Sequence, residues 1–92
     1  MGTIKIGTFT YELTNDTFVT SHEMGIRAIS VFCSTTTSGT VTGGKPLGSL
    51  LSSPLTVSQN ESITFQAIEA GSLGELTITA PSGCTLQIIA QV

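Results

Sequence analysis

Alternation of apolar and polar side chains, with a period of two residues, is the feature that most constrains how this chain can fold. Residues 62–67, 76–80 and 84–92 each place apolar side chains on one face and mostly Ser, Thr or Gln on the other. This period is typical of half-buried β-strands, since an amphipathic helix repeats about every 3.6 residues. In the last segment the expected inward residues are Cys84, Leu86, Ile88, Ala90 and Val92.

Turn signals between the alternating segments predict where the chain reverses. Pro81-Ser82-Gly83 separates two of them and predicts a hairpin with a three-residue turn. Asn15-Asp16 predicts a second turn, and residues 59–61 predict a third, between strands at 55–58 and 62–67. Near the N-terminus the apolar phase switches at Gly7-Thr8, which predicts a β-bulge.

Residues 26–33 are apolar on both faces, which predicts a strand that is covered on both sides. The stretch from Thr35 to Thr42 is rich in Thr, Ser and Gly and predicts one edge strand around Val41. No segment predicts an amphipathic helix. The pattern therefore indicates an all-β chain: a single domain over residues 1–92, built as a small antiparallel β-sandwich or jelly-roll-like fold of seven or eight short strands.

The composition is unusually poor in charge. Charged residues make up 10% of the chain, against about 25% in an average soluble protein, and Ser and Thr occupy 27 of its 92 positions. Only Lys5, Arg27 and Lys45 are cationic, which argues against a nucleic-acid partner. No apolar run is long enough to span a membrane, and the N-terminus does not read as a secretory signal. A surface that repels its own copies so weakly favours an ordered domain packed against neighbours, with a soluble monomer as the alternative.

No motif in the sequence predicts catalysis, a cofactor or a metal. Residues 39–45 fit the start of a phosphate-binding loop, but Pro46 stands where that loop needs a hydroxyl. His22 is the one histidine, and a zinc site needs at least three protein ligands. We therefore expect a protein that is not an enzyme, with no catalytic, cofactor-binding or metal-binding residues.

Two cysteines, Cys33 and Cys84, both occupy expected inward positions. A disulfide between them would contribute about 2–4 kcal/mol to stability. With no secretory signal, two buried thiols that act as small apolar side chains are the favoured interpretation.

The best candidates for an interface are apolar residues that the alternation does not assign to the core. They are Ile26, Ala28 and Phe32 in the doubly apolar strand and Ile89 on the outward face of the last strand. The alternative function is a small carbohydrate-binding or receptor-binding β module. That alternative needs an exposed aromatic ring, and Tyr11 and Phe18 are the available candidates.

Residues 55–92 contain the segments LTVSQNESITF and LTITAPSGCTLQIIAQV. These segments resemble small all-β virion proteins of tailed bacteriophages, in which a short strand, a turn, a similar strand and a Thr-rich hairpin close a compact domain. The resemblance implies a capsid-decorating, head-fibre or tail-associated subunit. It also implies a homo-oligomer, a trimer being one option, that docks on other structural proteins of a virion assembled in the host cytoplasm. It assigns no functional residue.

Overall fold

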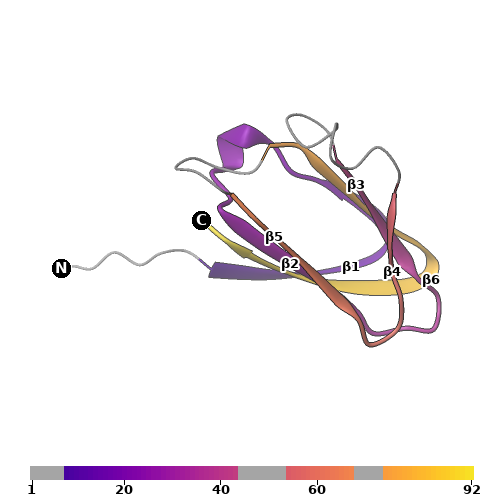
Figure 1. The fold of residues 1–92 in the computed structure, drawn as a ribbon. Coiled ribbons are helices and arrows are strands. Elements are labelled where there is room, and N and C mark those ends of the chain that lie inside the picture. The colour runs from indigo at the N-terminus through magenta and orange to yellow at the C-terminus, as the bar shows by residue number, and fades with distance from the viewer. Residues whose placement is uncertain (1–7, 44–53, 68–73) are drawn as a thin grey trace.

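The computed structural model describes residues 8–43, 54–67 and 74–92. Figure 1 shows one antiparallel sheet that curls into a half-barrel. The all-β prediction is confirmed, but the described residues form six strands in one curled sheet and not the predicted seven or eight. The elements are β1 (Thr8–Val19), the short 3-10 helix η1 (His22–Met24), β2 (Ala28–Cys33), β3 (Gly39–Gly43), β4 (Leu55–Val57), β5 (Ser62–Gln66) and β6 (Leu76–Gln91).

The 16-residue strand β6 organises the sheet. β1 pairs with one edge of β6 on both sides of residues 81–84. On the other edge, the first part of β6 pairs with β3 and the last part pairs with β2. β4 continues the sheet beyond β3, and β5 continues it beyond β2. The paired β1 and β6 thus form a long ribbon that carries two wings, β3–β4 and β2–β5.

The ribbon bends in the middle, and the bend explains the curl of the sheet. Thr14 pairs with Thr85 and Asp16 pairs with Ala80, so Asn15 lies opposite the four residues 81–84. Asn15 and Gly83 both have positive φ angles, 51° and 86°. Extra residues in one strand of a pair bend the strand and increase its twist. As a result the two wings face each other, as Figure 1 shows.

The predictions of a hairpin at Pro81-Ser82-Gly83 and of a turn at Asn15-Asp16 are therefore wrong. Both signals lie inside continuous strands that pair with each other. Asn15 and Gly83 adopt the left-handed backbone conformation that a turn would use. The chain does not reverse at either position, because β1 and β6 pair with each other on both sides of them. The turn at residues 59–61 is confirmed, with Asn60 at φ 67° and the Glu61 N–H donating to the Ser58 carbonyl.

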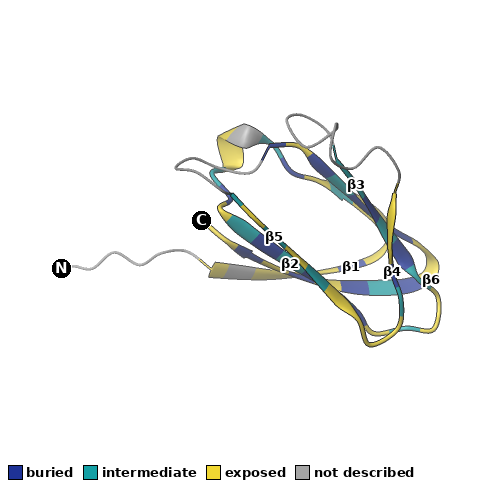
Figure 2. Cartoon of the chain, in the orientation of Figure 1, coloured by how far each residue is buried: buried dark blue, intermediate teal, exposed yellow. Residues whose placement is uncertain are grey.

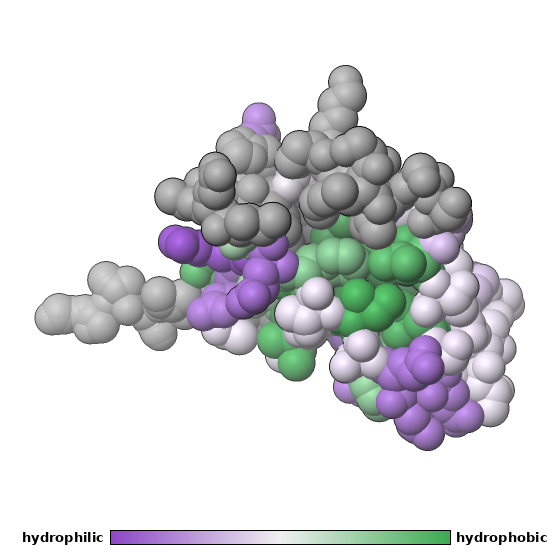
Figure 3. Space-filling view, in the orientation of Figure 1, coloured by the Kyte–Doolittle hydropathy of each residue, from purple (hydrophilic) through white to green (hydrophobic). Residues whose placement is uncertain are grey.

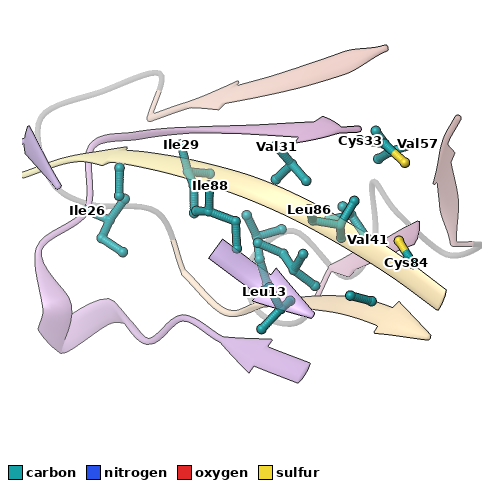
Figure 4. Close-up of a cluster of buried hydrophobic side chains, with 14 residues drawn as sticks. Leu13, Ile26, Ile29, Val31, Cys33, Val41, Val57, Cys84, Leu86 and Ile88 are labelled. Atoms are coloured by element: carbon teal, nitrogen blue, oxygen red, sulfur yellow. The ribbon is translucent and has the colours of Figure 1, made fainter. Parts of the chain in front are cut away.

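The core fills the space between the two wings, and its side chains come from every strand except β5, whose apolar residues pack against its margin. Figure 2 shows the alternation of buried and exposed residues along the strands, and Figure 4 shows the buried side chains. The inward residues expected in β6 are buried from Leu76 to Ala90, whereas Val92 is partly exposed. The buried apolar residues are Leu13, Ile26, Ile29, Val31, Cys33, Val41, Val57, Leu76, Ile78, Ala80, Cys84, Leu86, Ile88 and Ala90.

The margin of the core stays open between the two short outer strands. By register, Ile63 and Phe65 in β5 and Leu55 in β4 lie on the core side of the sheet, because they pair with buried residues of β2 and β3. All three are nevertheless partly exposed. Figure 3 shows apolar atoms at the surface between β5 and β4.

Two further predictions are corrected by the topology. β3, expected as an edge strand around Val41, lies between β4 and β6. β2, expected to be covered on both sides, has a buried inner face but an outer face on which Ala28, Ser30 and Phe32 remain partly exposed. The phase switch and bulge predicted at Gly7-Thr8 involve residues 1–7, which lie outside the described residues.

Candidate interaction surface

The outer face of the β1–β6–β2–β5 half of the sheet brings together three of the four predicted interface residues. Ile89 in β6 lies between Thr10 of β1 and Ser30 of β2 in one cross-strand row. Ala28 and Phe32 are the next outward residues on either side of Ser30. Since residues two apart on a strand share a face, Ala28, Phe32 and Ile89 form one triangle on the outer surface.

Ile26 does not belong to this surface, because its side chain is buried in the core with no exposed area. The strand β2 begins at Ala28, two residues later. Alternation therefore does not fix the direction of Ile26, and its side chain packs inward (Figure 4).

The apolar triangle is surrounded by polar side chains, among them Gln87 and Gln91, which flank Ile89 on the outer face of β6. Ile89 is 48% exposed, the largest value among the exposed large hydrophobic residues of the described chain, whereas Ala28 and Phe32 are half-buried. The hydroxyls of Ser30 and Thr64 hydrogen-bond to each other at 2.9 Å beside it. Ala28, Phe32 and Ile89 carry no charge, so covering them removes apolar area from water. One carboxylate, that of Glu12, lies on the same outer face, opposite Gln87.

A shallow depression of about 290 Å³ adjoins Ile89. It lies over the β1–β6 pair, lined by the cross-strand pairs Thr10–Ile89 and Glu12–Gln87 and the intervening Tyr11–Ile88 pair. Glu12 adds one carboxylate at its rim. The depression makes the outer face uneven beside Ile89.

Tyr11 and Phe18 form an aromatic pair that the sequence did not predict. Their ring centroids are 5.4 Å apart and their planes are tilted by 37°. By register both lie on the core side of β1, since Tyr11 pairs with Ile88 and Phe18 pairs with Ile78. The bend at Asn15 brings them together from the two halves of the strand. Tyr11 remains 43% exposed at the margin of the core.

Cys33 and Cys84 are both buried free thiols, as the sequence interpretation favoured. They lie at the same end of the core (Figure 4). The Cys33 thiol is within 3.3 Å of the Thr35 carbonyl oxygen and 3.4 Å of that of Thr37. Burial raises the pKa of the Cys84 thiol; the Thr35 hydroxyl lowers it, and the neighbouring Cys33 raises it further. The Thr35 hydroxyl also accepts a hydrogen bond from the Thr85 N–H.

The described residues bring together no constellation of catalytic or metal-binding groups. Within residues 8–43, 54–67 and 74–92, no three His, Cys, Asp or Glu side chains are close enough to hold a metal ion. Residues 39–43, the start of the loop-like motif, form strand β3 and not a phosphate-binding loop. The Glu61 carboxylate accepts a hydrogen bond from the Ser58 N–H at 3.1 Å and so stabilises a turn.

Comparison with protein-family models, curated proteins and solved structures found no match to this chain. Over the described residues, no helix has the length and hydrophobicity needed to cross a bilayer.

Proposed function

We propose that this protein is a non-enzymatic structural subunit that acts by self-association and by docking on a larger particle. The observation that carries the proposal is the apolar triangle of Ala28, Phe32 and Ile89 on an outer face whose neighbouring side chains are polar. A contiguous apolar patch framed by polar residues is typical of a surface that contacts another protein. The low charge of the chain supports the same role, because it removes the usual electrostatic barrier to association.

The particle that we propose is the virion of a tailed bacteriophage, with the chain as a capsid-decorating, head-fibre or tail-associated protein. The support is the resemblance carried by residues 55–92. One part of that resemblance departs from the structure, since the Thr-rich hairpin it implies is a single bent strand here. We also propose that the curled sheet acts as a small sandwich, whose two layers are the facing wings β2–β5 and β3–β4.

Charge introduced into the triangle tests the self-association. We expect the wild-type chain to form an oligomer in solution and Ile89→Lys to lower its mass, because an ammonium group would be buried in the contact. Thr56→Lys is the matched control, since Thr56 is an exposed residue of β4 in the other wing. The masses are measured by native mass spectrometry at two concentrations, with circular dichroism to verify the fold. An Ile89→Lys oligomer of unchanged mass contradicts the assignment of this face.

A carbohydrate-binding module is the second candidate, and the exposed Tyr11 ring beside Phe18 favours it. A sugar ring can stack on an exposed aromatic face, with nearby polar groups that bind its hydroxyls. Glycan-array binding that is lost in Tyr11→Ala would support this candidate over the structural subunit.

A further inference from the structure

The free edge of β1 is the longest strand edge that no other strand of the described sheet pairs with. In the part of the chain that the structure describes, β1 pairs only with β6, and its other edge is open over 12 residues. The other two outer strands, β4 and β5, have three and five residues. Folded proteins protect their edges with short strands, charged side chains (lysine above all), proline, β-bulges or a covering segment. β1 contains no Lys, Arg or Pro, and its bulge at Asn15 lies outside the segment Thr8–Thr14, where Glu12 is the one charged residue.

The regular part of β1 is centred on Tyr11. The strand keeps unbroken register with β6 from Thr8 to Thr14, and the bulge follows at Asn15. Tyr11 is the fourth of these seven residues. Two identical strands that pair antiparallel overlap over this whole segment in only one register, the one that places Tyr11 of one chain opposite Tyr11 of the other.

The charges of β1 disfavour two of the shifted registers. Glu12 and Asp16 are its two charged residues. A shift that centred the pair on Glu12 would place two carboxylates opposite each other, and a shift that centred it on Thr14 would place Glu12 opposite the partner's Asp16. Like charges directly opposite destabilise a strand pair. In the register centred on Tyr11, Glu12 lies opposite the partner's Thr10.

We propose that the free edge of β1 pairs with the β1 edge of a second copy of this chain, antiparallel, with a twofold axis at Tyr11. The inference rests on the self-association proposed above and adds a second contact between copies, along the edge of β1, to the one proposed at the apolar triangle. The two curled sheets join into one continuous sheet. Tyr11, now 43% exposed, comes to lie between Phe18 and the partner's Tyr11, so the contact buries an aromatic cluster in addition to pairing the backbones.

Disulfide trapping tests the register directly. Opposite residues of an antiparallel pair have Cβ atoms about 4.5–5.5 Å apart, close to the separation that a disulfide needs. With oxidised glutathione as the oxidant, Tyr11→Cys should give a cross-linked species of twice the chain mass, which reductant removes. Glu12→Cys is the matched control on the next residue, and the wild-type chain controls for Cys33 and Cys84. No cross-link in Tyr11→Cys, or an equal one in Glu12→Cys, overturns the inference.

A charge variant gives an independent measurement. Tyr11→Lys places two ammonium groups opposite each other and should abolish the β1 contact, which lowers the solution mass. Val19→Lys adds the same charge to an exposed residue of the same strand outside the paired segment and should leave the mass unchanged. If Ile89→Lys dissociates the oligomer but Tyr11→Cys gives no cross-link, the pairing of β1 is refuted and the proposed function stands. A wild-type chain that is monomeric at every concentration refutes the β1 pairing and the self-association together.

Discussion

Gly39 packs so closely against Leu86 that a Cβ on residue 39 would lie 2.6 Å from Leu86 Cδ1. Leu86 is fully buried, so its side chain cannot move into solvent to make room. Gly39→Ala should therefore lower the free energy of unfolding by about 1–3 kcal/mol, the usual cost of an overpacked core. Urea denaturation followed by circular dichroism measures this loss.

The double variant Gly39→Ala/Leu86→Val is the control for this explanation. Valine in place of Leu86 removes part of the side chain that the new methyl group would meet. The double variant should then lose less stability than the sum of the two single losses. If the two losses simply add, the contact between residues 39 and 86 does not explain the effect of the alanine.

Thr20 is the only fully buried polar side chain in the described part of the chain, and it ties the end of β1 to the start of β6. Its hydroxyl donates to the Gly74 carbonyl and accepts from the Leu76 N–H, both at 2.9 Å. Thr20→Val keeps the shape but leaves these two buried groups without a partner. We expect Thr20→Val to lower the free energy of unfolding by about 2–3 kcal/mol. Thermal or urea unfolding measures it.

Thr20→Ser is the matched variant, because it keeps the hydroxyl and removes only a methyl group. Thr20→Ser should lower the free energy of unfolding by about 1 kcal/mol. Equal losses for the serine and valine variants would show that packing and not hydrogen bonding makes Thr20 important.

The in-and-out pattern of the strands could be predicted because it depends on local sequence alone. Alternation placed Ile78 and Leu86 inward and Ile89 outward, and the structure agrees at all three. The pattern was wrong at Ile26, whose side chain is buried. Ile26 precedes β2 and lies in no strand, so alternation does not determine which way its side chain points. The candidate surface could therefore be found in part from the sequence, as far as its residues lie in strands.

The path of the chain could not be predicted, because a turn signal fixes a backbone conformation and not the direction that follows. Asn15 and Gly83 both adopt the left-handed conformation that their residue types favour. The sequence predicted a chain reversal at each of them. Asn15 instead lies opposite residues 81–84, so the two positions together form one bend in the β1–β6 pair. That outcome depends on pairing between residues far apart in the sequence. The free edge of β1 and the contact of Tyr11 with Phe18 follow from the same pairing, so the sequence alone could not reveal them.

The buried Cys84 thiol makes stability depend on pH in the alkaline range. Burial raises the pKa of Cys84 in the folded chain above its ordinary value, which is about 8.5 in an unfolded chain. The unfolded chain therefore releases this proton first as the pH rises. The contribution of Cys84 is fully present below about pH 8.5 and is lost progressively above it, as the pH approaches the folded pKa.

We therefore expect the free energy of unfolding of the wild-type chain to fall as the pH rises above about 8.5. Cys84→Ala should be less stable at neutral pH, since it leaves a small cavity, but its stability should fall less over the same range. Urea unfolding at several pH values gives both curves. Parallel curves would assign the alkaline loss to other groups. A thiol reagent should also label both cysteines in urea and neither in the folded chain, because both are fully buried.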